Sequence, residues 1–309
     1  MISRSTLIGA LVVVELAIVG SAVRAIAGDG GQPAAGPAFN GLSWHGRTTD
    51  RTVVDRTIPS GSDPRVVVDV HDVDVVIEPG AQFGVHVVES VHKAGYVSGE
   101  LSPISVSPTA DGVRIAAAGS TMHVVIGALT RRLKVVVPPA ARVEVVSGGQ
   151  IDTSGLRAKL VAHVEDGAIH VSDQRGDVDV STGSGRIYLT DVQAADIAAS
   201  TSEGRLYFTR VGADRLDAHT NFGRIYATDL RAVDGALTTK EGRVTVSLAG
   251  NSDAVVSAKV TDDNDIHVSG LPVAEDGANK RVVRLGSGRG RFEVSSDDGS
   301  ITLTQGANV

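Results

Sequence analysis

The stretch "GSGRIYLTDV" (Gly183–Val192) is followed by "SEGRLYFTRV" (Ser202–Val211) and by "NFGRIYATDL" (Asn221–Leu230). Each copy places an arginine directly after a glycine and a tyrosine two residues later, with an aliphatic residue between them. This alternation of polar and apolar side chains predicts a strand that buries one face. Because the same strand recurs at nearly equal spacing, the sequence predicts an architecture built from stacked repeats.

The repeat extends beyond these three copies. The glycine of the unit Gly-x-aliphatic-x-apolar recurs at intervals of 18 or 19 residues, at Gly149, Gly167, Gly185, Gly204, Gly223 and Gly242. This period is too short for a propeller blade or a helical repeat, and it suits one coil of a parallel β-helix-like β-solenoid with two short strands. A looser copy places Asn264 in the glycine position, and Gly290 and Gly299 follow at irregular spacing.

Each position of the repeat forms a column when the coils are stacked. Two residues after the glycine comes an aliphatic column that we expect to face inward, with Ile187, Leu206 and Ile225 among its members. Three residues before the glycine is a threonine column of the same inward parity, formed by Thr182, Thr201, Thr220 and Thr239. Gly183 and Asn221 are residue types that suit a left-handed corner between the two strands of a coil.

Composition supports an all-β chain. The 309 residues are 42% hydrophobic but only 3% aromatic, so a core must be built from small aliphatic side chains. No window outside the N-terminal segment shows a convincing helical period. The chain has no cysteine, which excludes disulfides and thiolate metal ligands. Its formal charge of −7 is spread over interspersed acids and bases without a basic block, so we expect no nucleic-acid partner.

The N-terminus predicts export and divides the chain into four parts. Arg4 precedes an apolar run from Leu7 to Val23, which predicts a signal peptide or an N-terminal membrane anchor over residues 1–28. Residues 29–60 are predicted to be a flexible Gly/Pro/Ala-rich tether. Residues 61–147 are predicted to be a region of β-strands, and residues 148–309 the solenoid repeat. Whether residues 61–147 continue the solenoid stays open at this stage.

Several of these strands resemble a known family. The segments "GDVDVSTGSGRIYLTDV", "VHDVDVVIEPG" and "LKVVVPPAARVEVVSGGQI" are similar to the DUF4097 family of adhesin-like proteins with β-strand repeats. The resemblance covers about Val66 to Thr304. It implies a β-repeat fold and a location outside the cytoplasm, and it brings no motif of catalytic residues with it.

The outward columns are the candidate binding site. One residue after the glycine stand Arg186, Arg205 and Arg224, and two residues further stand Tyr188, Tyr207 and Tyr226. These six residues form a ribbon of guanidinium groups and rings that could stack on sugars or meet an acidic polymer. The alternative is a solvated outer face in which the arginines pair with Glu203 and Glu241.

Other candidate sites have less support from the residues. Asp262, Asp263 and Asp265 are weak calcium candidates, because they lack the spacing of a known calcium loop and suit a turn equally well. The histidines have no metal-ligand spacing, so no metal and no cofactor are expected. The segment "GSGRG" (Gly286–Gly290) has no helix after it and does not suit a nucleotide phosphate. The acids are distributed around the coils rather than paired in a groove, so we expect no enzyme.

These observations predict an exported, non-catalytic adhesin-like protein of the cell envelope, either secreted or anchored in the membrane. Its outer ladders would bind a surface glycan or an envelope protein, and only the N-terminal segment would contact the membrane. A second hypothesis is a structural module that self-associates through the ends of the solenoid. A third is a polysaccharide-active β-helix enzyme.

Overall fold

The computed structural model describes residues 49–80, 84–119, 121, 123–261 and 265–306. These residues lie in one compact unit, which spans 46–309. They form strands, turns and loops without a helix, so the all-β prediction is confirmed for the described part of the chain. No helix in this part is long and apolar enough to span a membrane. The predicted signal or anchor segment, residues 1–28, lies outside the described residues and stays a prediction.

Twenty strands belong to one sheet with both parallel and antiparallel pairs. In chain order they are β1 (Thr49–Pro59), β2 (Arg65–Val70), β3 (Asp74–Pro79), β4 (Gly84–Ser98), β5 (Ser105–Pro108), β6 (Gly112–Ala117), β7 (His123–Val137), β8 (Arg142–Ser147), β9 (Ile151–Ser154), β10 (Leu160–Ser172), β11 (Val178–Thr190), β12 (Gln193–Thr209), β13 (Gly212–Glu241), β14 (Val244–Leu248), β15 (Ala254–Val260), β16 (Ile266–Ser269), β17 (Val273–Asp276), β18 (Lys280–Arg284), β19 (Gly290–Asp298) and β20 (Ile301–Gln305).

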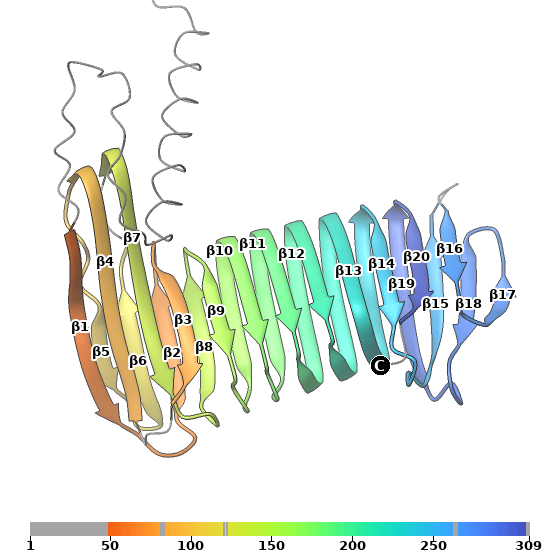
Figure 1. Cartoon of the computed structure of the whole chain (residues 1–309), viewed down its shortest axis with the longest axis horizontal. Helices are drawn as coiled ribbons and strands as arrows, with labels where there is room; N and C mark the ends of the chain where they lie inside the picture. The colour runs from red at the N-terminus through yellow and green to blue at the C-terminus, as the bar shows by residue number, and fades with distance from the viewer. Residues whose placement is uncertain (1–48, 81–83, 120, 122, 262–264, 307–309) are drawn as a thin grey trace, which may run out of the picture. The chain divides into compact units, whose positions relative to one another are not determined.

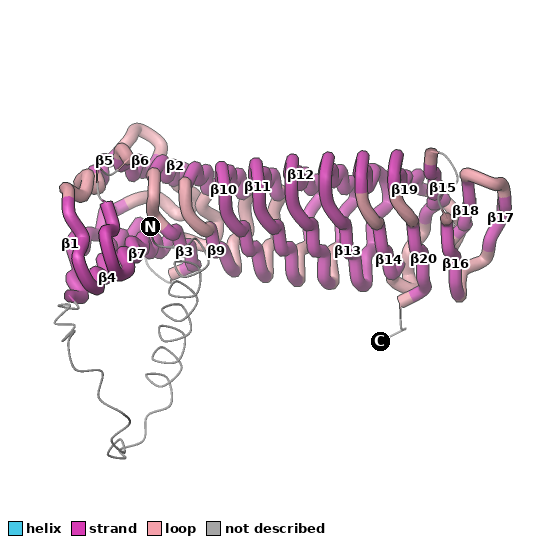
Figure 2. The backbone as a smooth tube through the Cα atoms, turned by 90° about the horizontal axis from the view of Figure 1, so that it is seen from above, coloured by secondary structure: helices cyan, strands magenta, loops and turns pink. Residues whose placement is uncertain are grey.

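The central strands stack as parallel coils (Figure 1). β10, β11, β12 and the first part of β13 pair in register, so that Leu160 aligns with Val178, Val178 with Ile197 and Ile197 with Leu216. The offset between neighbouring coils is 18 or 19 residues, which is the predicted coil length. Each long strand bends near its repeat glycine and thereby contributes to two rows of strands, which Figure 2 shows from above.

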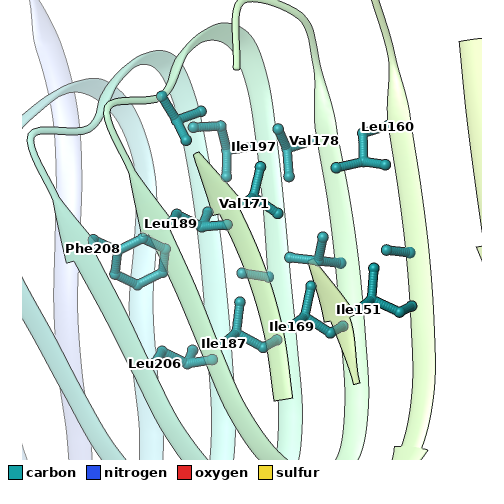
Figure 3. Packing of buried hydrophobic residues seen from close by; sticks show 14 of the residues in the cluster. Ile151, Leu160, Ile169, Val171, Val178, Ile187, Leu189, Ile197, Leu206 and Phe208 are labelled. Carbon is teal, nitrogen blue, oxygen red and sulfur yellow. The ribbon is translucent and has the colours of Figure 1, made fainter. Parts of the chain in front are cut away.

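The predicted inward columns form the core between the two rows. Ile151, Ile169, Ile187 and Leu206 lie side by side in a row across neighbouring coils in Figure 3, and each has 0% of its surface exposed. The next inward column holds Val171, Leu189, Phe208, Ala227 and Val246, all of which are buried. Each fully buried aliphatic side chain stabilises the fold by about 1.5–3 kcal/mol relative to exposure. The hydrophobic effect along these columns therefore holds the coils in register.

The threonine and glycine columns fill the bend of each coil. Thr182, Thr201, Thr220 and Thr239 are all buried. The Thr182 hydroxyl donates to the Gly167 carbonyl oxygen at 3.3 Å, one coil away. A Cβ atom on Gly204 would lie only 1.7 Å from the Gly185 carbonyl oxygen, so the coils approach more closely here than any side chain allows.

The left-handed residues do not lie at the bend where they were predicted, near Gly183 and Asn221, but at the other bend of the coil. Positive φ angles occur at Asp173, Asp191, Arg210 and Asp229, six residues after the repeat glycines, and not at Gly183 or Asn221. Aspartate tolerates this conformation better than most residues with a side chain, because its carboxylate can bond to nearby backbone. The bend at Gly183 is instead limited by space, since a Cβ there would lie 2.7 Å from the Glu165 carbonyl oxygen.

At the N-terminal end the order of the coils departs from the order of the chain. β2 lies between β6 and β8, and β3 lies between β7 and β9, with parallel pairing throughout. The segment 65–79 therefore stacks directly on the coil 142–154 and continues the stack. Antiparallel strands close this end, because β5 pairs with β6, β4 with β7 and β1 with β4.

Two features of this end differ from expectation. Residues Thr49–Pro59 form β1, contrary to the tether predicted over residues 29–60, because they pair with β4 along its length. Between the antiparallel strands β7 and β4, Arg131 Nε donates to a Glu89 carboxylate oxygen, and both side chains are buried. Arg131 also donates to the Ser102 carbonyl oxygen. A buried ion pair therefore covers the end of an otherwise apolar core.

The C-terminal end shows the same departure from chain order. β19 lies between β13 and β15, and β20 lies between β14 and β16. The segment 290–305 is thus inserted into the stack, and β15 and β16 lie outside it (Figure 1). Gly299 joins the glycine column directly after Gly242, so the irregular spacing in the sequence reflects an insertion rather than the end of the repeat. β18 pairs antiparallel with β15, and β17 pairs antiparallel with β18.

Candidate binding surface

The structure brings the six predicted ligand-binding residues together on one outer surface. Arg186, Arg205 and Arg224 align across β11, β12 and β13, and so do Tyr188, Tyr207 and Tyr226. The residues between them, Ile187, Leu206 and Ile225, are fully buried. Because side chains alternate along a strand, the arginines and tyrosines face outward.

A third column on this surface was missed by the sequence reasoning. Thr190, Thr209 and Thr228 align two residues beyond the tyrosines, at least partly exposed and facing outward. The signal was present in the sequence as Arg-x-Tyr-x-Thr in all three copies. We call the nine residues the Arg-Tyr-Thr face: Arg186, Tyr188, Thr190, Arg205, Tyr207, Thr209, Arg224, Tyr226 and Thr228.

The tyrosine rings stack on one another. The ring centroids of Tyr188 and Tyr207 are 4.8 Å apart with an interplanar angle of 5°, and those of Tyr207 and Tyr226 are 5.3 Å apart at 10°. The rings are therefore nearly parallel at the spacing of neighbouring coils. Both faces of the Tyr207 ring are covered, so this ring presents its edge and hydroxyl group to the outside.

The column continues toward the N-terminal end with different chemistry. The His170 ring lies 4.6 Å from the Tyr188 ring, tilted by 43°. His170 Nδ1 is 2.7 Å from a carboxylate oxygen of Asp152 on the preceding coil. Gln150 Nε2 donates to both oxygens of that carboxylate, at 2.9 and 3.0 Å. An acidic group therefore stands at this end of the tyrosine column.

The arginines do not make the ion pairs predicted for a solvated face. Within the described part of the chain, no carboxylate forms an ion pair with Arg186, Arg205 or Arg224, and Glu203 and Glu241 pair with none of them. The column partners are the phenol groups instead. Arg224 Nη1 donates to the Tyr226 hydroxyl at 3.4 Å.

The electrostatics of Arg205 follow from the same contact. Its hydrogen bond to the Tyr207 hydroxyl raises the pKa of the Arg205 guanidinium above its ordinary value. The next coil extends the cationic column with Arg243, whose Nε donates to the Ser300 hydroxyl at 3.1 Å. Four guanidinium groups thus stand one per coil, charged at every physiological pH and without a carboxylate partner among the ion pairs of the described residues.

The other candidates do not form a site in the described residues. Asp262 and Asp263 lie outside the described residues, and the backbone carbonyl of Asp265 accepts from Ile301 N at 3.0 Å. Among the residues that are described, no three histidine, aspartate or glutamate side chains gather in a way that could hold a metal ion.

The glycine-rich segment "GSGRG" is a turn built around an internal carboxylate. Asp253 accepts from the Ser287 hydroxyl at 2.9 Å and from Gly288 N at 2.7 Å. These bonds hold the pKa of the Asp253 carboxyl below its ordinary value. The backbone amides form an anion-binding concavity of the kind found in phosphate sites, but a side chain of the same molecule occupies it.

A shallow cavity of about 560 Å³ adjoins this turn, and its lining includes Arg175, Asp214, Arg231 and Asp253. Glycoside hydrolysis by two carboxyl groups needs one of them to be a general acid with a raised pKa. The pKa of Asp253 is lowered, and its oxygens are already bonded to the turn. The cavity is therefore lined by both acidic and basic side chains, and Asp253 does not suit the role of its general acid.

The fold and the exposed columns define an all-β repeat protein with one chemically regular outer surface. Residues 159–305 match the model of the family described as Toastrack DUF4097. The resemblance seen in the sequence is thus confirmed over these residues. No curated protein matches the chain in sequence.

Several solved structures match this chain at low sequence identity. A "putative adhesin" from Parabacteroides distasonis is 14% identical, and the match covers 85% of this chain and 98% of that one with a TM-score of 0.48. A "putative adhesin" from Parabacteroides merdae is 11% identical, with 84% and 97% covered and a TM-score of 0.47. A "putative lipid binding protein" from Parabacteroides distasonis is 13% identical, with 85% and 98% covered and a TM-score of 0.38. A fold does not determine a function, so the function must be argued from the surface of this chain.

Proposed function

We propose that this chain is an exported, non-catalytic, adhesin-like β-solenoid protein of the cell envelope, and that its Arg-Tyr-Thr face binds a surface glycan or an envelope protein. The observation that supports it best is the set of aligned arginines without carboxylate partners. Like charges on adjacent strands repel one another, so an unpaired column costs stability that a structural role alone does not explain. A bound partner with complementary charge would remove that repulsion.

Regularity supports binding over catalysis. The same Arg-x-Tyr-x-Thr set repeats on three consecutive coils, and a repeating surface suits a repeating or extended partner. Catalysis requires a few groups in different roles at one point. Export follows from the apolar run predicted for residues 1–28, and a surface protein would present this face to material outside the cell.

The experiment is binding to native envelope material. We expect the full chain, immobilised on beads, to retain an envelope fraction, and the triple variant Y188A/Y207A/Y226A to lose most of that binding. The matched control is H163A/H219A, which removes two rings from the other row of strands, one on β10 and one on β13. Far-UV circular dichroism would verify that each variant is folded. Equal binding by wild type and the tyrosine variant would refute the proposal.

Self-assembly through the ends has less support from the structure. At the N-terminal side, antiparallel strands cover the end of each row: β5 covers the row that ends at β6, and β4 followed by β1 covers the row that ends at β7. β18 and β17 cover one row at the C-terminal side. Edge strands that are covered or short offer little template for another chain, and β16 has only four residues.

A further inference from the structure

We propose that the ligand of the Arg-Tyr-Thr face is an extended acidic polysaccharide, whose carboxylate or phosphate groups bind the arginine column, and that neutral glycans do not bind there. This inference rests on the proposed function and names the ligand class. Three observations on the nine residues lead to it, namely the charge of the arginines, the closed faces of the rings and the row of hydroxyl donors.

The arginine column presents a regular array of positive charge. Arg186, Arg205, Arg224 and Arg243 stand one per coil, so the array spans about 14 Å at the usual spacing of strands. Each guanidinium group has a planar set of donors that matches a carboxylate or a phosphate. Glu203 and Glu241 occupy the next exposed column beyond the glycines, and neither forms an ion pair with these arginines in the described residues.

The tyrosine column argues against a neutral sugar. Neutral sugars usually bind proteins by placing a ring on the face of an aromatic side chain, and single-stranded nucleic acids stack their bases in the same way. The faces of Tyr207 are covered by Tyr188 at 4.8 Å and by Tyr226 at 5.3 Å. No sugar or base fits between rings at that separation, so Tyr207 can act only through its edge and hydroxyl group. The far side of Tyr226 faces the coil that carries Thr245, so at most one ring face at that end of the column stays without an aromatic neighbour.

The groups that do face outward are donors. Guanidinium N–H, phenol O–H and threonine O–H groups lie in three parallel columns, and all of them donate hydrogen bonds. An acidic polymer along the stack would therefore meet arginine at its anionic groups and hydroxyls at its sugar oxygens. The Asp152 carboxylate beside His170 would repel an anion, so the site ends at that coil.

The test uses the full chain and three defined polymers in affinity electrophoresis. Polygalacturonate carries carboxylates, inorganic polyphosphate carries phosphates, and dextran is neutral. We expect binding to polygalacturonate, to polyphosphate or to both, and much weaker binding to dextran. Equal or tighter binding of dextran would overturn the inference, and so would failure of both acidic polymers.

The variants locate the binding. We expect R186Q/R205Q/R224Q to lower the affinity for the acidic polymer at least about 10-fold and to reduce the slope of log K against log salt by about 2. We expect Y188F/Y207F/Y226F, which keeps the stack and removes the hydroxyls, to lower it by a smaller factor. The control R142Q/R284Q/R291Q makes the same charge change at exposed arginines elsewhere. An equal loss in the control would show nonspecific attraction and overturn the inference.

The envelope assay separates this inference from the proposed function. If the tyrosine-to-alanine variant loses envelope binding but no acidic polymer binds the wild type, the face is a binding site and the ligand class is wrong. If the envelope binding is unaffected by changes at the face, the proposed function itself fails.

Discussion

Replacing Gly204 by alanine tests whether close approach of the coils requires glycine in the repeat column. A Cβ on Gly204 would lie 1.7 Å from the Gly185 carbonyl oxygen, and a Cβ on Gly223 would lie 1.7 Å from that of Gly204. The φ angle of Gly204 is outside the left-handed region, so alanine can adopt the backbone conformation. The cost of the substitution therefore comes from contact between neighbouring coils alone.

The size of the effect follows from the displacement that alanine requires. An ordinary contact of a Cβ begins at 3.4 Å, so the two strands must move apart by about 1.7 Å at this point. Strands are normally about 4.8 Å apart, and such a shift breaks the ladder hydrogen bonds on either side. Two lost bonds cost about 1 kcal/mol each. With looser packing of the adjacent Leu206, we expect a loss of about 2–4 kcal/mol, near the upper end for one substitution.

The assay is thermal unfolding followed by far-UV circular dichroism. A loss of about 3 kcal/mol corresponds to a decrease in Tm of about 10 °C for a domain of this size. Gly61→Ala is the matched control, because no atom lies within 4 Å of a Cβ at that position. If the Gly204 variant melts within about 2 °C of the Gly61 variant, close approach does not explain the glycine column.

Three further predictions concern the core and its ends. Thr201→Val should leave stability unchanged or raise it by up to about 1 kcal/mol in urea unfolding, because the buried Thr201 hydroxyl has no hydrogen-bond partner in the described residues. Arg131→Met should lower the unfolding free energy by about 3–5 kcal/mol, because it leaves the Glu89 carboxylate buried without its partner, and adding Glu89→Leu should restore most of it. Asp253→Asn should destabilise the chain at pH 7, and a pH titration of Tm should show that difference shrinking below about pH 4. The folded-state pKa of Asp253 lies below the ordinary 3.8, so its contribution is present above that value and is lost on acidification.

The repeat period allowed most of the coil to be predicted. Alternation along the strand identified Ile187, Leu206 and Ile225 as inward residues, and all three are fully buried. The corner was assigned to the wrong residues, because glycine and asparagine are the usual signs of a left-handed turn and this chain uses Asp191 and Asp229. The repeat glycines are needed instead where the carbonyl oxygen of one coil approaches the backbone of the next. A single sequence does not show whether a glycine is needed for such a close approach or for a turn.

The order of the coils could not be predicted from the order of the chain. Parallel pairing depends on matching inward columns, and any segment with the right alternation can occupy any place in the stack. The sequence does contain one sign of the inserted segment: Arg243 and Ser300 are 57 residues apart, which is three times 19. That interval indicates that both residues belong to the same column. It does not reveal that β15 and β16 lie beyond β19 and β20 in the stack.

The sequence predicted which residues form the candidate site, but it did not predict the contacts that these residues make. Reading columns from the repeat identified Arg186, Arg205 and Arg224 with their tyrosines. The ion pairs to Glu203 and Glu241 do not form in the described residues. The stacking angle of 5° between Tyr188 and Tyr207 depends on side-chain torsions, which the sequence does not specify. Our proposal of an anionic ligand depends in part on that angle.

The position of the Arg-Tyr-Thr face within the stack has a physical reason. The arginines stand on coils that pair with a neighbour on both sides, whereas inserted segments and antiparallel strands occupy the two ends. In a repeat protein each coil is stabilised mainly by its immediate neighbours. Repulsion within a column of like charges would therefore separate a terminal coil more readily than an internal one. The internal coils can carry an unpaired cationic column because the backbone ladders and aliphatic columns on both sides keep them in register.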